Sequence, residues 1–205
     1  MAAAWTFRDA AGLALAARWG LYADAAICAL AAALSLALGA DALIFGDFAR
    51  PLALVQLATA LGSLVLFLCW FYRANANARA LGATDLMGSP GLAVAWFFIP
   101  IAFLFMPYMV VRDTWKASGD PKDWQGRSAP PLIWLWWACF LGAAIAGTLS
   151  LRFAWEGGFD MLPVIGWLDL VANLLSIPAA LLGAAIVAHI HRMQTSPRHL
   201  ADRFA

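Results

Sequence analysis

Residues 51–72, PLALVQLATALGSLVLFLCWFY, contain no charged side chain, and this apolar run constrains the fold more than any other feature of the chain. A helix needs about 20 consecutive apolar residues to cross the hydrocarbon core of a bilayer. Three further apolar runs occupy residues 25–46, 131–151 and 163–190. The pattern predicts an all-α integral membrane protein with four transmembrane helices.

Composition supports this class, because 64% of the residues are hydrophobic and only 12% are charged. Soluble domains have about twice that charged fraction. The formal net charge is +1 and there is no long basic run, which argues against a nucleic-acid partner. No internal repeat or composition shift marks a boundary, so residues 1–205 are expected to form a single helical membrane domain.

The first 20 residues are rich in Ala and Leu and carry Trp5 and Trp19. Tryptophan favours the membrane–water interface, where its ring is dry and its N–H is wet. We predict a short N-terminal interfacial helix that leads into the first span. A helical extension of that span fits the same residues.

Residues 91–111 are apolar and uncharged, but they contain Pro100 and Pro107. Each proline removes a backbone N–H and disfavours helical angles in the residue before it. We therefore predict a broken, re-entrant element made of a short helix at 91–99, a bend, and an interfacial helix at 107–118. A kinked fifth span is the alternative.

The distribution of Lys and Arg favours re-entry, because basic loops stay cytoplasmic. If 91–111 returns to its own side, only Arg50 and Arg152 lie outside, and the other 11 of the 13 basic residues share a side with both termini. If the segment crosses, the division is five against eight. The expected location is a bacterial inner membrane, crossed several times, with cytoplasmic N- and C-termini.

Several motifs follow one another at characteristic distances: WFYRANANA (70–78), SPGLAVAWFFIP (89–100), Pro107-Tyr108, DTWKAS (113–118) and WLWW (134–137). Together they resemble the bacterial membrane family called domain of unknown function 4328. The resemblance is good over about residues 51–140 and implies an integral bacterial membrane protein, with no reaction attached. Phe103 stands where that family usually has Asn, which weakens any role of the bend in coordination through an amide.

Asp169 is the most conspicuous candidate for a polar, ion or ligand site, because a carboxylate in an apolar helix is costly and often functional. Asn173 lies one turn later on the same face. Alternatively, Asp169 reaches headgroups or pairs with Arg152. Arg73 and Asn77 form a second candidate pair, four residues apart, that would cap carbonyls freed by Pro100 or bind lipid phosphate. An ordinary interfacial arginine is the simpler interpretation.

The tryptophans are expected to anchor the protein at the interface, and some of them also suit the wall of a lipid or ligand pocket. These candidates are Trp96, Trp134, Trp136 and Trp137. His189 and His191 are two residues apart and therefore lie on different faces of a helix, so no metal site and no cofactor are predicted. No nucleophile–base set is evident, and the sequence gives no reason to expect an enzyme.

Two function classes stay open. The first is a non-catalytic module that interacts with membrane lipids, with a membrane protein partner, or with copies of itself through its many small residues. The second is a small transporter or channel that uses Asp169, Asn173 and the broken helix around Pro100, because interrupted membrane helices often form binding sites.

Overall fold

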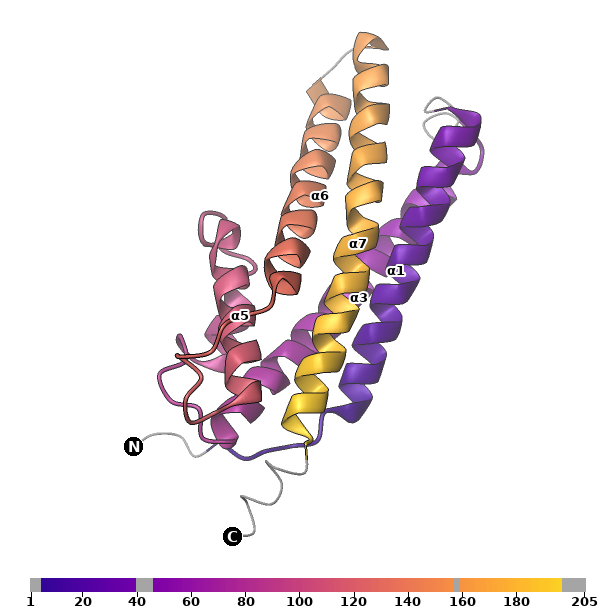
Figure 1. The fold of residues 1–205 in the computed structure, drawn as a ribbon. Helices are drawn as coiled ribbons and strands as arrows, with labels where there is room; N and C mark the ends of the chain where they lie inside the picture. Colours follow the sequence, from indigo (N-terminus) through magenta and orange to yellow (C-terminus); the bar gives the residue numbers. More distant parts are fainter. Residues whose placement is uncertain (1–4, 40–45, 157–158, 197–205) are drawn as a thin grey trace. The chain divides into compact units, whose positions relative to one another are not determined.

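The computed structural model describes residues 5–39, 46–156 and 159–196, and every regular element within those ranges is helical. Four long helices are apolar enough to cross a membrane (Figure 1). They are α1 (Ala11–Leu38), α3 (Ala49–Ala80), α6 (Pro131–Glu156) and α7 (Leu162–Gln194). This confirms the predicted all-α fold with four membrane-spanning helices. The shorter elements are α4 (Pro90–Ala95), α5 (Met106–Gly119) and the 3-10 turns η1 (Ala102–Leu104) and η2 (Phe159–Met161).

Helix α1 begins earlier and ends earlier than the sequence predicted. From residue 5 onward there is no separate N-terminal interfacial helix, because α1 runs without interruption from Ala11, where the Asp9 carboxylate accepts the first backbone N–H at 2.9 Å. Residues 1–4 of that predicted helix lie outside the described residues. The alternative, a helical extension of the first span, is correct from Ala11 onward. The helix ends at Leu38 because Gly39 adopts a φ of 84°, a common C-terminal stop. Residues 40–45, which the predicted span included before its end at residue 46, lie outside the described residues.

The other three spans are longer than predicted at one or both ends. Helix α3 includes Pro51 in its first turn, where a missing N–H costs nothing, and continues through the polar RANANARA sequence. Helices α6 and α7 extend past the predicted limits at 151 and 190, and α7 is continuous through Pro178. Hydropathy located the apolar centre of each helix but not its polar ends.

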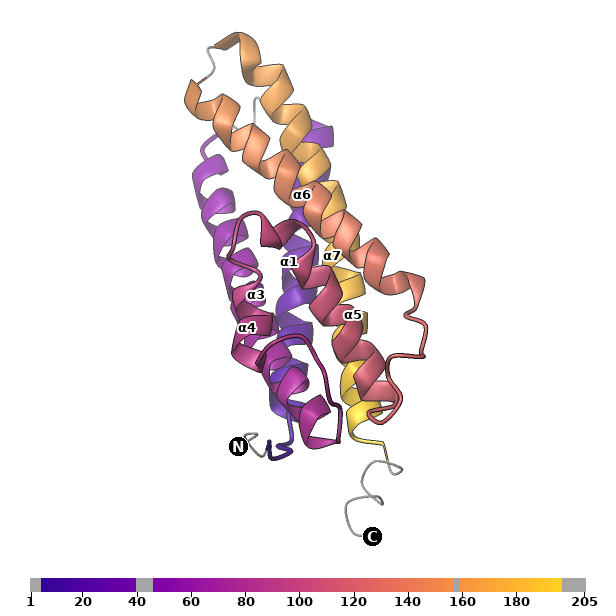
Figure 2. The same ribbon diagram turned by 90° about the vertical axis from the view of Figure 1, so that its left-hand side faces the viewer.

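The stretch between α3 and α6 is broken, as its prolines predicted. Ser89 caps α4 by accepting the Leu92 N–H at 3.2 Å, and α4 ends at Ala95 rather than at the predicted residue 99. Turns and η1 follow, and α5 then begins beside Pro107. Figure 2 shows the chain passing up through α4, bending round, and returning down through α5. The segment is therefore a hairpin of two helices and not a single rod.

Residue contacts divide the chain into two compact units. Unit 1 comprises Met1–Arg18, Leu64–Trp134 and Ala184–Ala205, and unit 2 comprises Trp19–Ser63 and Leu135–Gly183. Each unit has its own aromatic cluster. In unit 1 the ring of Phe97 packs edge-on against Phe67 and Phe71 of α3, with centroids 6.2 and 6.0 Å away, and so fixes the hairpin to that helix. In unit 2 the rings of Trp136, Trp137 and Phe140 pack together along α6.

Candidate functional site: a polar cleft in unit 2

A cleft of about 920 Å³ lies within unit 2, between α1, α3, α6 and α7. Alanine and leucine side chains make up most of its wall, which is the expected character of a helix bundle in lipid. Polar side chains from all four helices also line it. They are Asp24 and Cys28 of α1, Gln56 of α3, Ser150 of α6, and Asp169, Asn173 and Ser176 of α7.

Asp169 and Asn173 line this cleft together, as expected for residues one helical turn apart. The Gln56 amide donates a hydrogen bond from Nε2 to Asn173 Oδ1 at 2.8 Å. Asn173 Nδ2 in turn donates to the backbone oxygen of Asp169 at 2.9 Å. The amide pair therefore ties α3 to α7 and fixes the orientation of Asn173 beside the carboxylate.

Among the described residues, neither carboxylate of the cleft forms an ion pair with a basic side chain. The hydroxyl of Ser150 lies beside Asp169, and that of Thr59 beside Asp24. Thr59 Oγ1 donates to the backbone oxygens of Val55 and Gln56, each 3.0 Å away. Because the Thr59 proton is used by these backbone oxygens, Asp24 retains capacity to accept a hydrogen bond or to contact a cation.

None of the residues that line the cleft is Lys, Arg or His. Arg152, one alternative partner considered for Asp169, pairs with Glu156 at 3.2 Å, and the described residues contain no Asp169–Arg152 ion pair. The described residues contain no group of three or more His, Cys, Asp or Glu side chains that could hold a metal ion. The cleft thus combines negative charge with neutral dipoles, which suits a cation or a ligand rich in hydrogen-bond donors.

Arg73 and Asn77 do not belong to this cleft, because both lie in unit 1. Asn77 is buried and accepts the Arg8 N–H at 3.0 Å while donating to the Arg8 oxygen at 2.8 Å. It therefore holds the N-terminal segment on α3 and does not cap carbonyls near Pro100, contrary to that prediction. The Phe103 N–H donates to the Ile99 oxygen at 2.6 Å, so a local turn satisfies the backbone there.

The predicted tryptophan candidates also lie outside the cleft lining. Trp136 and Trp137 are buried in the aromatic cluster of α6, which makes them packing residues. Trp134 is 55% exposed, as an interface anchor would be. Trp96 buries its indole Nε1 without a hydrogen-bond acceptor among the described residues.

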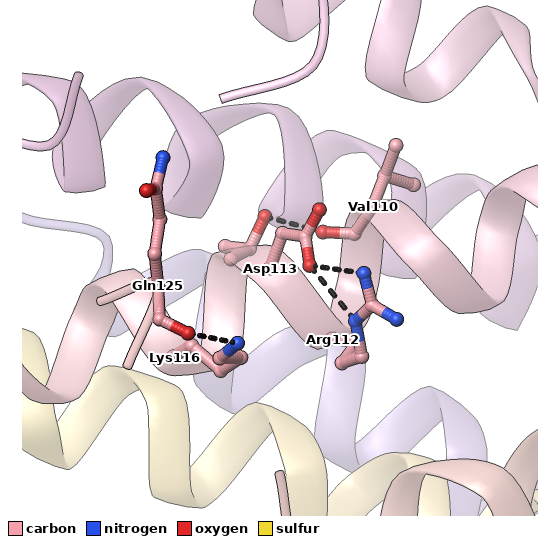
Figure 3. A network of polar contacts seen from close by, with 6 residues as sticks. Val110, Arg112, Asp113, Lys116 and Gln125 are labelled. Atoms are coloured by element: carbon pink, nitrogen blue, oxygen red, sulfur yellow. Dashed lines mark hydrogen bonds and ion pairs between the residues drawn. The ribbon is translucent and has the colours of Figure 1, made fainter. Parts of the chain in front are cut away.

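Unit 1 contains a separate polar network, which joins side chains to backbone and neighbouring side chains around α5 (Figure 3). The buried Asp113 carboxylate pairs with Arg112 at 2.8 Å, and Lys116 Nζ donates to the Gln125 oxygen at 3.0 Å. Asn75 Nδ2 donates to Thr114 Oγ1 at 2.9 Å. Each of these groups is matched by protein, so the network stabilises the fold rather than offering a binding site.

Five polar residues of the cleft were not predicted from the sequence: Asp24, Cys28, Gln56, Ser150 and Ser176. The predicted first span began at residue 25, which placed Asp24 in a polar flank. Because α1 begins at Ala11, this carboxylate lies well inside an apolar helix of 28 residues. An acid in such a position is the signal that would have identified it.

The sequence was compared with family models, with curated proteins and with solved structures. The family model described as "Domain of unknown function (DUF4328)" matches residues 35–192, which is well over half of the chain. The comparisons with curated proteins and with solved structures give no match. The matched range contains all the motifs from Trp70 to Trp137 on which the resemblance was based. The chain therefore belongs to the family defined by the domain of unknown function DUF4328.

Proposed function

We propose that this integral membrane protein binds a small cationic solute in the polar cleft of unit 2. The observation that carries the proposal is that Asp24 and Asp169, from α1 and α7, line one cleft that has no basic side chain in its wall. Gln56 and Asn173 add fixed amide dipoles to the same wall.

Electrostatics favours a cation over a neutral or anionic solute. A carboxylate inside an apolar helix costs about 2.5–3.5 kcal/mol on insertion scales, and a nearby opposite charge offsets that cost. A monovalent ion, a proton or an organic ammonium group would supply such a charge. Transport of the bound cation is the stronger form of the proposal, and it corresponds to the transporter or channel that the sequence analysis gave as the second of two function classes.

The proposed setting is a bacterial inner membrane, with both termini in the cytoplasm and the α4–α5 hairpin entering the bilayer and returning. The strong bias of Lys and Arg toward one side supports this topology. Apolar side chains at the bend also support it, because Phe98, Ile101 and Phe105 are 65%, 80% and 63% exposed. Such an exposed apolar cluster is unfavourable in water and favourable in lipid.

A non-catalytic interaction module is the second candidate function, and the same exposed bend favours it. The cluster of Phe98, Ile101 and Phe105 would serve as a contact surface for lipid, for a membrane protein partner or for another copy of this chain. Replacing Ile101 by Ser and following oligomeric state and partner retention in detergent tests this role separately from the cleft.

The cleft is tested by thermal unfolding of the purified protein in detergent at constant ionic strength. Sodium, potassium, ammonium and tetramethylammonium chlorides are the probes. A ligand that binds only the native state raises the unfolding midpoint with concentration. We expect at least one of these cations to do so, and Asp169→Asn and Asp24→Asn to remove most of the shift.

Asp160→Asn is the matched control, because Asp160 is an exposed aspartate of η2 outside the cleft lining. It should keep the response of the unchanged protein. A cation response that is equal in all three aspartate variants would rule out the cleft as the binding site. Ion flux into liposomes, with the same variants, then separates a transporter from a protein that only binds.

A further inference from the structure

A second pocket lies in unit 1, where the first turns of α1 pass the last turns of α7 (Figure 1). Its volume is about 410 Å³. Its polar wall is basic, with Arg18 from α1 and His191, Arg192 and Thr195 from the end of α7 and beyond. The remaining wall is apolar, and it includes Leu15, which is 55% exposed.

The positive charge of this pocket is not balanced within the described part of the chain. None of the residues that line the pocket is acidic, and the ion pairs among described residues are Arg112–Asp113 and Arg152–Glu156. Arg18 buries its Nε atom without a hydrogen-bond acceptor there. A buried guanidinium N–H without a partner is costly and indicates a missing acceptor.

Helix electrostatics accounts for only part of this arrangement. His191 and Arg192 lie in the last turn of α7, where cations stabilise the partial negative charge of the helix end. Arg18 belongs to a different helix, well past the first turn of α1, and the dipole gives no reason for its position. The Thr195 hydroxyl donates to the His191 oxygen at 2.9 Å, so the cationic groups remain the main donors toward the pocket.

We infer that this pocket binds a phosphate group, and that the phosphate belongs to an anionic phospholipid. Two guanidinium groups match the geometry and charge of a phosphate through paired N–H donors. Basic pockets between membrane helices commonly hold phospholipid headgroups. The exposed Leu15 beside the arginines offers a surface for the start of an acyl chain, which a free phosphate ion would not use.

Native mass spectrometry of the full chain tests the inference, after exchange into micelles with phosphatidylglycerol, phosphatidylcholine or inorganic phosphate. Arg192→Gln changes an exposed residue and should leave the fold intact. Arg18→Lys keeps the positive charge but removes the planar guanidinium group with its paired N–H donors. Each variant should weaken phosphatidylglycerol binding about tenfold, the effect of losing one charge-assisted contact. Arg50→Gln, at an exposed arginine outside the pocket, is the matched control and should bind normally.

Selective retention of phosphatidylglycerol over phosphatidylcholine, lost in both pocket variants, supports the lipid site. Saturable retention of inorganic phosphate, lost in the same variants and without any lipid preference, supports the phosphate chemistry but assigns it a soluble source. Equal retention of both lipids and no phosphate binding overturns the inference. So does an effect of Arg50→Gln as large as that of Arg192→Gln.

Discussion

Unit 1 and unit 2 both contain polar side chains within a very apolar chain, but the partners of these side chains differ between the two units. In unit 1 the buried amides of Asn75, Asn77 and Gln194 each hydrogen-bond to a distant segment of the chain. In unit 2 the carboxylates of Asp24 and Asp169 line a cleft that has no basic side chain in its wall.

The difference separates two uses of polarity in a membrane protein. A buried group whose partners are all protein atoms contributes to one unique packing, and its removal leaves those partners unpaired. A charged group beside a cleft has incomplete compensation and lowers stability unless a ligand is present. Polar substitutions should therefore have opposite effects on the free energy of unfolding in the two units.

The largest effect is expected at Gln194, which is 2% exposed and donates to the Ala74 oxygen at 2.8 Å and to Ser118 Oγ at 2.9 Å. Replacing it by Leu removes both bonds and should destabilise the protein by about 2 kcal/mol. The free energy of unfolding, followed by circular dichroism during an SDS titration in mixed micelles, measures this change. Gln125→Leu is the control, because Gln125 is exposed and contributes its backbone oxygen, not its side chain, to the Lys116 contact in Figure 3. Equal effects of the two substitutions would contradict a structural role for Gln194.

The next largest loss of stability is expected at Gly88, which lies in a loop of unit 1. This residue has a φ of 64°, and an added Cβ would lie 2.5 Å from Leu92 Cδ2. Arg79 donates to the Gly88 oxygen and so holds the loop against α3. Gly88→Ala should cost about 1.5 kcal/mol, because a left-handed conformation disfavours any side chain. Gly147→Ala, at a helical glycine with nothing within 4 Å of the added Cβ, should be neutral or slightly stabilising in the same titration.

The sequence predicted those features of the fold that depend on local composition. Apolar run length located the four spans, and Pro100 and Pro107 predicted the break between α4 and α5. It did not predict where α1 begins, because the Ala-rich residues after Ala10 fit both a separate surface helix and an extension of the span. The choice depends on packing, in which Ala14 and Ala17 are buried.

The candidate site was predicted only where its residues are close in sequence. Asp169 and Asn173 share a helix face, so their spacing alone placed them together. Gln56 lies 117 residues from its partner Asn173, and no pattern within one sequence links them. For Asn77 the predicted partner was wrong, because the Arg8 backbone that Asn77 binds is 69 residues away in the sequence.

In unit 2, replacing a cleft carboxylate should raise the free energy of unfolding, whereas replacing Gln194 in unit 1 should lower it. Asp169→Asn keeps a polar side chain that can hydrogen-bond to Ser150 but removes the charge from the cleft. Without added cation, this substitution should stabilise the protein by about 1 kcal/mol, the difference between a charged and a neutral polar group at such a depth. The same SDS titration measures it, in a buffer of low ionic strength. Destabilisation of the size expected for Gln194→Leu would place Asp169 among the structural groups and remove the contrast between the units.

The smallest effect is expected at the Arg152–Glu156 pair of unit 2, whose side chains are 67% and 64% exposed. An exposed ion pair one helical turn apart gains little, because water screens both charges, so Glu156→Gln should change the free energy of unfolding by less than about 0.5 kcal/mol. The Arg112–Asp113 pair of unit 1 is the useful comparison, since its carboxylate side chain is only 9% exposed. Asp113→Asn leaves the half-buried Arg112 guanidinium without the buried carboxylate charge that it pairs with, and the SDS titration should give a larger loss than for Glu156→Gln. Equal losses of unfolding free energy for Glu156→Gln and Asp113→Asn would contradict this expectation. Burial of the carboxylate would then not determine how much an ion pair stabilises this protein.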